Sequence, residues 1–414
     1  MPPKLHFHSD CEFFAGCERG MPLLWNSDKL IKSYDLSFSF SQNARYQTEV
    51  KPFLSPSLKI YPVRFQDDLL RQLQVRQKNS KSWLTLVTLN LIRVLQLLTL
   101  YPRFIYDVLK LLRLFRKIRP EILHLNNGGY PGALSVRAAA VAGWLSRCNK
   151  IVMVVNNIAA PYERPSRWLD YPLDRLVVRS TNLFVTASLT ARESLIGVLH
   201  LDPTKVVAIP NSVSLVLPCV SEETTRCEFG SNRKSIVVGM VALLTARKGH
   251  FVLVQAIKQL LENRHELEND LSVWFVGDGE MHDELQELVS KARIGSIVKF
   301  LGYRNDYSRI LLSMDIVVQP SLANEDSPLA TIEAMGLGKP IVASRLAGLA
   351  EQIAHGENGF LIDPGSTDQL ANALEILIDD VGLRQRMGDK GKARYQALFS
   401  MDAFIERYYQ LYSN

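Results

Sequence analysis

The stretch Glu325-Asp326-Ser327-Pro328-Leu329-Ala330-Thr331-Ile332-Glu333-Ala334-Met335-Gly336 decides the interpretation of this chain. The apolar residues before it, 314–321, end in a turn, which predicts a buried strand that runs into a loop. Good helix formers fill residues 330–337, so a helix is expected directly after the loop. Strands that alternate with helices in this way are typical of an α/β domain.

Two carboxylates mark the stretch, with Glu325 in the expected loop and Glu333 about one turn inside the expected helix. Ser327 is predicted as the N-cap, and Pro328 suits the first turn, where a missing N–H costs nothing. The free N–H groups of such a helix favour an anion, and a glutamate one turn in can reach a neutral hydroxyl. The pattern therefore predicts a site for a phosphorylated, hydroxyl-rich ligand.

Residues 325–333 resemble the paired-glutamate motif of the family 4 glycosyltransferases, and the similarity is strongest over residues 239–363. The resemblance implies an α/β fold of the GT-B type, with two doubly wound Rossmann-like domains facing a central cleft, and transfer with retention of anomeric configuration. It implies that Glu325 acts beside the donor sugar and that Glu333 binds the nucleotide ribose. The donor-binding residues implied at the helix start are Ser327, Pro328, Leu329, Ala330 and Thr331.

Length and charge fit a two-domain soluble protein. The chain has 414 residues, a length that exceeds what one core usually fills. Its residues are 47% hydrophobic and 22% charged, as is ordinary for a soluble globular protein. Residues 1–205 contain 28 Lys and Arg against 15 Asp and Glu, whereas the remainder contains 20 against 27. A basic half joined to an acidic half suggests that the first half meets an anionic partner.

Cysteine usage and the start of the chain suggest a cytoplasmic protein. The five cysteines are odd in number and lack metal-ligand spacing with nearby histidines, so free thiols and no metal site are expected. The first residues, Met-Pro-Pro-Lys-Leu-His, lack the apolar core of a signal peptide.

Two positions in the first half are implied as donor contacts. The turn Ala15-Gly16-Cys17-Glu18 lies where the family has Gly-Gly-x-Glu facing the donor diphosphate, which implies a role for Gly16. A run without polar alternation, 150–155, predicts a strand buried on both faces. Asn156 follows it where the family usually has a histidine near the donor sugar, and asparagine can still hydrogen-bond a hydroxyl.

The second half carries the implied phosphate contacts in the loop 243–250. Family members have an arginine near the start of this loop and Lys-Gly at its end, both on the donor phosphates. Lys248 fits that pattern, but Leu243 replaces the arginine, so either Arg247 substitutes for it or donor binding is weaker. Gly302 lies in a loop that packs on the nucleobase in the family.

A basic region is expected within residues 81–119. Residues 83–100 carry a single charge, and residues 104–118 predict an amphipathic helix. The basic face contains Lys110, Arg113, Arg116 and Lys117, opposite Ile105, Val108, Leu111, Leu112 and Phe115. Such a helix is typical of contact with an anionic membrane surface or a lipid-linked acceptor. A core-packed helix and, for residues 83–100, a membrane span are the alternatives.

The predicted organisation is an acceptor-binding domain over residues 1–213, a linker over 214–234 and a nucleotide-sugar domain over 235–395. Residues 396–414 are expected to form a helix that crosses back to the first domain.

The expected activity is retaining transfer from a nucleotide-diphosphate sugar to a glycan or lipid-linked acceptor. It would serve cell-surface polysaccharide or glycolipid synthesis at the inner face of the membrane, without nucleic acid. No Asp-x-Asp motif is present, so neither a metal nor another cofactor is expected to take part.

Two other functions compete with this one. Leu243, Ala15 and Asn156 depart from the family pattern, as they would in a catalytically weak relative that serves as a binding or assembly partner at the membrane. A nicotinamide-dependent oxidoreductase is disfavoured because no complete Gly-x-Gly-x-x-Gly fingerprint is present.

Overall fold

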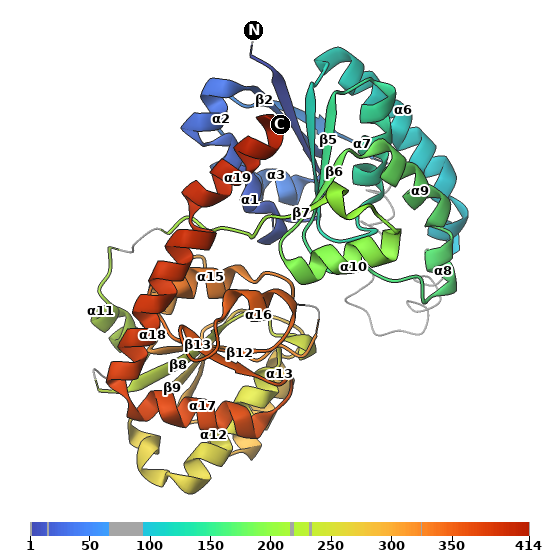
Figure 1. The fold of residues 1–414 in the computed structure, drawn as a ribbon. Helices are drawn as coiled ribbons and strands as arrows, with labels where there is room; N and C mark the ends of the chain where they lie inside the picture. Colours follow the sequence, from blue (N-terminus) through green and yellow to red (C-terminus); the bar gives the residue numbers. More distant parts are fainter. Residues whose placement is uncertain are drawn as a thin grey trace. The chain divides into compact units, whose positions relative to one another are not determined.

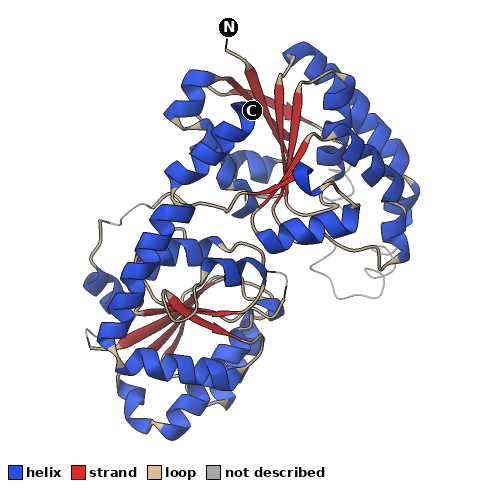
Figure 2. Ribbon diagram, in the orientation of Figure 1, coloured by secondary structure: helices blue, strands red, loops and turns tan. Residues whose placement is uncertain are grey.

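The computed structural model describes residues 2–14, 16–65, 94–215, 219–231, 234–323 and 325–413. The chain divides into two compact units. The first contains Met1–Ile209 and Ile405–Asn414, and the second contains Pro210–Phe404. Each unit has its own parallel sheet with helices on both faces (Figures 1 and 2).

The first unit contains a seven-stranded parallel sheet in the order β3-β2-β1-β4-β5-β6-β7. Its strands are β1 (Lys4–Ser9), β2 (Asp35–Ser41), β3 (Lys59–Val63), β4 (Ile122–Asn127), β5 (Lys150–Val155), β6 (Leu183–Thr186) and β7 (Val206–Ala208). The strand order reverses between β1 and β4, which pair in register from Leu5↔Ile122 to Ser9↔Asn126. In open α/β sheets, ligands bind beyond the carboxyl ends of the strands at such a reversal.

The second unit contains a six-stranded parallel sheet in the order β10-β9-β8-β11-β12-β13. Its strands are β8 (Ile236–Val241), β9 (Leu271–Val276), β10 (Val298–Phe300), β11 (Ile316–Gln319), β12 (Ile341–Ser344) and β13 (Gly359–Ile362). Here the order reverses between β8 and β11, so the loops after these two strands occupy the expected ligand position. The doubly wound α/β fold predicted for both halves is confirmed.

Helices connect the strands in both units. In the first unit they are α1 (Gly20–Trp25), α2 (Asp28–Ser33), α3 (Ala44–Val50), α6 (Leu100–Ile118), α7 (Leu134–Leu145), α8 (Pro165–Trp168), α9 (Tyr171–Ser180) and α10 (Leu189–Leu199). The second unit has α11 (Glu222–Glu228), α12 (His250–Asn263), α13 (His282–Lys291), α14 (Tyr307–Leu312), α15 (Leu329–Gly336), α16 (Ala347–Gln352), α17 (Thr367–Asp379) and α18 (Val381–Arg394).

The last helix, α19 (Met401–Ser413), begins in the second unit and ends in the first. Its end packs on the first sheet, where Tyr412 Oη lies 2.7 Å from His124 Nδ1. The segment predicted as a linker, 214–234, includes α11, which belongs to the second unit.

Helix α6 packs its apolar side into the core of the first unit, together with α7 and the sheet. Val108, Leu111, Leu112 and Phe115 are buried, whereas Ile105 is 58% exposed. Ile105 therefore lies outside the buried part of the apolar stripe that was predicted for this helix. No helix in the described part of the chain is long and apolar enough to cross a membrane. Most of the apolar segment predicted at 83–100 lies outside the described residues.

Candidate functional site

Two loops meet at the strand-order reversal of the second sheet. One follows β8 and contains Lys248, and the other follows β11 and contains Glu325. Gly249 makes their close approach possible, because its φ is +75° and an added Cβ would lie 2.0 Å from the carbonyl oxygen of Pro320. The Leu322 amide also donates to the carbonyl of Arg247 at 2.7 Å.

An ion pair joins the two loops. Lys248 Nζ lies 2.5 Å from Glu325 Oε2, and Arg247 Nη1 lies 3.4 Å from the same oxygen. The hydroxyl of Ser321 donates to this oxygen as well, at 3.0 Å. The three residues predicted as catalytic from the sequence are therefore brought together within one unit.

Lys248 and Glu325 are both buried, with exposed fractions of 8% and 6%. Burial lowers the pKa of Lys248, and the carboxylate of Glu325 opposes that shift. Next along the chain, His250 is buried beside Phe275, and both of its ring nitrogens lack a hydrogen-bond partner. Burial and the charge of Lys248 lower the pKa of His250 to about 4, so its imidazole is neutral at pH 7.

Helix α15 follows Glu325 as expected, but its cap differs from the prediction. Pro328, not Ser327, is the N-cap residue, and no side chain caps the helix. The hydroxyl of Ser327 instead accepts a hydrogen bond from Gln352 Nε2 at 3.1 Å. Because Pro328 has no side-chain acceptor, the first N–H groups of α15 keep their capacity to bind an anion.

The helix start is partly open to solvent. Ser327, Pro328, Leu329 and Ala330 are half-buried, whereas Thr331 is buried and donates to the Pro328 carbonyl at 2.8 Å. Thr331 also hydrogen-bonds Gln352 through its hydroxyl.

Glu333 lies one turn inside α15 and is 2% exposed. Its Oε1 accepts a hydrogen bond from the hydroxyl of Ser308 at 2.5 Å. Ser308 belongs to α14, so this contact fixes the carboxylate between two helices. A carboxylate held in this way can accept hydrogen bonds from ligand hydroxyls with its remaining lone pairs.

Gly302 follows β10 with a φ of +67°, and an added Cβ would meet no atom within 4 Å. Its carbonyl accepts a hydrogen bond from the Gly277 amide at 2.8 Å. The next side chain, Tyr303, is 67% exposed. Leu243, at the position where the resemblance implies an arginine, is 52% exposed.

In the first unit, Asn156 and the turn that contains Gly16 lie near the carboxyl ends of β1 and β4. Gly16 is exposed at the start of the single turn Gly16–Glu18. Asn156 Nδ2 donates to Asn126 Oδ1 at 2.8 Å, and Asn126 Nδ2 donates to Glu18 Oε1 at 2.8 Å. This hydrogen-bond chain therefore joins Asn156 to Glu18, the last residue of the turn that Gly16 begins.

The centre of this chain, Glu18, was missed as a site residue. It is fully buried, and its carboxylate accepts hydrogen bonds from Ser9, Cys11, Tyr46 and Asn126. Burial raises the pKa of Glu18, and these hydrogen bonds oppose the shift. The turn 15–18, which contains Glu18, was recognised in the sequence. Tyr46, a hydrogen-bond partner of Glu18, lies 28 positions away, so this contact could be found only in the structure.

One group in the described part of the chain has the donor atoms for a metal ion, namely Cys11, Cys17 and Glu18, whose ligand atoms lie within 4.8 Å of one another. The Cys11 thiol already donates to Glu18 Oε1 at 3.0 Å, and its hydrogen bonds and burial raise the pKa of that thiol. The thiolate form that binds a metal is therefore disfavoured.

The four predicted membrane or acceptor residues lie on α6. Arg113, Arg116 and Lys117 are exposed, and Lys110 is half-buried. Lys110, Arg113 and Lys117 line a groove, whereas Arg116 does not belong to its lining.

Comparison with known proteins agrees with this geometry. Residues 221–394 match the family "Glycosyl transferases group 1", and residues 75–216 match "Glycosyltransferase Family 4". The chain is 30% identical over 282 residues to an Escherichia coli protein named UDP-Gal:alpha-D-GlcNAc-diphosphoundecaprenol alpha-1,3-galactosyltransferase, covering 66% of this chain and 70% of that protein. It is 29% identical to the lipopolysaccharide core biosynthesis glycosyltransferase LpsE of Rhizobium meliloti, over 45% of this chain and 52% of LpsE.

Among solved structures, Anabaena HepE in complex with UDP superposes with a TM-score of 0.75 over 99% of both chains, at 19% identity. This likeness supports the fold that the resemblance implied. The chain therefore belongs to the group 1, family 4 glycosyltransferases and is a glycosyltransferase of the GT-B fold.

Proposed function

We propose that the protein moves a sugar from a nucleoside-diphosphate donor to a glycan or lipid-linked acceptor, with retention of anomeric configuration. The observation that carries this proposal is the pairing of Lys248 with Glu325 at the strand-order reversal, directly before the uncapped start of α15.

Departure of the diphosphate from the anomeric carbon is the step that these groups would assist. Negative charge grows on the leaving group as the bond breaks, and fixed cations and aimed N–H groups stabilise it most in a dry site. Lys248, with Arg247 beside it and the α15 N-terminus opposite, would supply that stabilisation. Glu325 holds the Lys248 ammonium in position and would face the donor sugar.

The donor's nucleoside would lie against Glu333 and the loop at Gly302. A carboxylate can accept hydrogen bonds from both ribose hydroxyls, and the space beside Gly302, next to the exposed ring of Tyr303, would admit a planar base. A uridine nucleotide is the first candidate, because HepE was solved with UDP and with UDP-glucose.

We predict that Glu333→Gln weakens donor binding. Charge-assisted hydrogen bonds are worth about 1.5–3 kcal/mol, so the donor KM should rise roughly tenfold or more while kcat changes little. Steady-state kinetics with the donor as the varied substrate measures this. Glu357→Gln removes an exposed carboxylate from the same unit and should behave as wild type. An unchanged KM in Glu333→Gln would mean that Glu333 does not contact the ribose.

We also predict that transfer needs no divalent cation. Lys248, Arg247 and the α15 N-terminus would provide the positive charge that a metal provides elsewhere. Activity should therefore be the same in EDTA as in Mg²⁺ or Mn²⁺, after the protein has been passed over a chelating resin. Loss of turnover in EDTA that Mg²⁺ or Mn²⁺ restores would contradict this part of the proposal.

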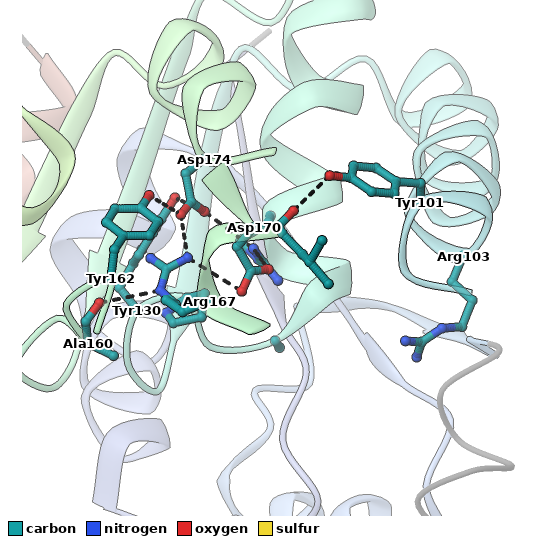
Figure 3. A network of polar contacts seen from close by, with 12 residues as sticks. Tyr101, Arg103, Tyr130, Ala160, Tyr162, Arg167, Asp170 and Asp174 are labelled. Atoms are coloured by element: carbon teal, nitrogen blue, oxygen red, sulfur yellow. Dashed lines mark hydrogen bonds and ion pairs between the residues drawn. The ribbon is translucent and has the colours of Figure 1, made fainter. Parts of the chain in front are cut away.

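We propose that the acceptor is carried by a membrane and that the first unit docks on it peripherally. Exposed apolar side chains gather at the start of α6 and at the end of α8, including Leu98 (72% exposed), Ile105 (58%) and Trp168 (57%). The hydroxyl of Tyr101 donates to the Leu169 carbonyl at 2.8 Å and so joins the two segments (Figure 3). Aromatic side chains with one polar end favour the membrane interface.

The E. coli relative supports a lipid-linked acceptor, because its name specifies a GlcNAc-diphosphoundecaprenol substrate. A role in cell-surface polysaccharide or glycolipid synthesis at the cytoplasmic face of the membrane follows from that chemistry. No nucleic acid takes part in this proposal.

A further inference from the structure

A basic groove lies between the edge strand β3 and helix α6 of the first unit. It is a shallow hollow, largely open to solvent, of about 470 Å³. Arg64 lies just after β3, and Lys110, Arg113 and Lys117 come from α6, while Val63 and Leu114 give the groove an apolar part. Spacings of three and four residues bring Lys110, Arg113 and Lys117 to one side of the helix.

Among the described residues, the lining has four cationic side chains and no carboxylate. Within the described residues, no ion pair involves Arg64, Arg113 or Lys117, and the one acidic residue of α6, Asp107, is 2% exposed. Like charges three and four residues apart on a helix repel each other, and a bound anion would relieve that repulsion.

Lys110 is held in place by the protein itself. Its ammonium group hydrogen-bonds the Arg64 carbonyl and lies 5.6 Å from the centre of the Tyr106 ring. This contact brings the loop after β3 against α6, so that Arg64 and the α6 residues face one volume. Two arginines offer paired N–H donors and two lysines offer compact charges, which together suit the several oxygens of a phosphate better than one carboxylate.

The same helix provides a comparison residue. Arg116 is exposed but lies outside the groove. It follows Ile105 by eleven positions, about three helical turns, so it continues the exposed stripe that begins with Leu98 and Ile105. Diffuse attraction to a negative surface would use Arg116 as much as Lys117, whereas a groove that holds one phosphate group would use only Lys117.

We propose that this groove binds a phosphate or diphosphate group of a membrane-borne lipid. That the phosphate belongs to a lipid rests on the proposed function. The exposed apolar side chains on the first half of α6 would contact the membrane and would place the second half of the helix at the level of the lipid headgroups. The binding chemistry itself rests on the lining alone. The donor site lies in the second unit, so phosphate binding here is a separate event from donor binding.

Vesicle flotation tests the proposal with the full-length protein at constant ionic strength. Vesicles of phosphatidylglycerol in phosphatidylcholine would be compared with phosphatidylcholine alone. Lys117→Gln and Arg64→Gln should each weaken binding to the anionic vesicles about fivefold, whereas Arg116→Gln, with the same change in charge, should weaken it less than about twofold. Pyrophosphate should release the wild-type protein more effectively than sodium chloride of equal ionic strength.

Several results would overturn the proposal. Equal losses in Lys117→Gln and Arg116→Gln, with pyrophosphate acting only as salt, would mean diffuse attraction and no groove site. Pyrophosphate binding that depends on Lys117 without any vesicle binding would mean that the ligand is a soluble phosphate. UDP should bind Lys117→Gln as tightly as it binds wild type, because the donor site lies in the second unit. This titration therefore distinguishes an error in the groove proposal from an error in the proposed donor site.

Discussion

Replacement of Lys248 by alanine should lower kcat by about 10²- to 10³-fold, a loss typical of removing one group that stabilises developing negative charge. Lys248 is held 2.5 Å from Glu325 in a buried position, so its charge acts without much screening by water. The donor KM should change less than kcat, because the contact strengthens as the diphosphate leaves. Nucleoside diphosphate release, measured with saturating donor, tests this.

Arg247→Ala is the matched control for this experiment. The side chain of Arg247 is 42% exposed and lies 3.4 Å from the same Glu325 oxygen, so its removal should cost less. A larger loss in Arg247→Ala than in Lys248→Ala would show that Arg247 has taken the role of the arginine missing at Leu243. Small and equal losses in both would contradict the mechanism. Far-ultraviolet circular dichroism of both variants checks that the loop change leaves the fold intact.

The second large effect concerns stability. Asp174→Asn should lower the free energy of unfolding by about 3–5 kcal/mol, because Asp170 alone would then balance the two buried charges of Arg137 and Arg167. Asp174 is fully buried, with Oδ2 2.6 Å from Arg167 Nη1 and Oδ1 3.3 Å from Arg137 Nη1. Tyr130 and Tyr162 donate to the same carboxylate, at 3.1 and 2.5 Å (Figure 3).

Urea denaturation followed by circular dichroism measures this loss. Glu193→Gln, which breaks an exposed pair with Arg192, should change stability by less than about 1 kcal/mol. A loss below about 1 kcal/mol in Asp174→Asn would mean that the network adds little. The network matters for the proposed docking surface, because Arg167 and Asp170 flank the exposed Trp168 and fix the position of its segment.

The fold could be predicted because its signals are local. Parallel strands buried on both faces appear in the sequence as apolar runs, as at 150–155 and 314–321, and each was followed by a recognisable turn. The predicted strand 150–155 is the observed β5. Glu325 and Glu333 stood out because they lie in a loop and a helix that follow an apolar strand, whereas Lys248 was identified through the resemblance to the family.

The errors arose where tertiary packing decides. An amphipathic pattern does not say how wide the buried stripe is, and Ile105 lies just outside it. The cap of α15 depended on Gln352, a residue 25 positions from Ser327, which engages the serine hydroxyl. Glu18 and Asp174 were missed because their partners come from other elements. The groove likewise needs Arg64 and Lys117, which lie more than fifty positions apart.

The central claim is that the second unit binds a nucleoside diphosphate through Lys248 and Glu333. Isothermal titration of UDP, GDP and ADP into wild type, Lys248→Ala and Glu333→Gln tests it most directly. We predict one-to-one binding of one of these nucleotides, with UDP the first candidate, and an affinity reduced roughly tenfold or more in each variant. If none of the three nucleotides binds, or if both variants bind as tightly as wild type, the proposed donor site is contradicted.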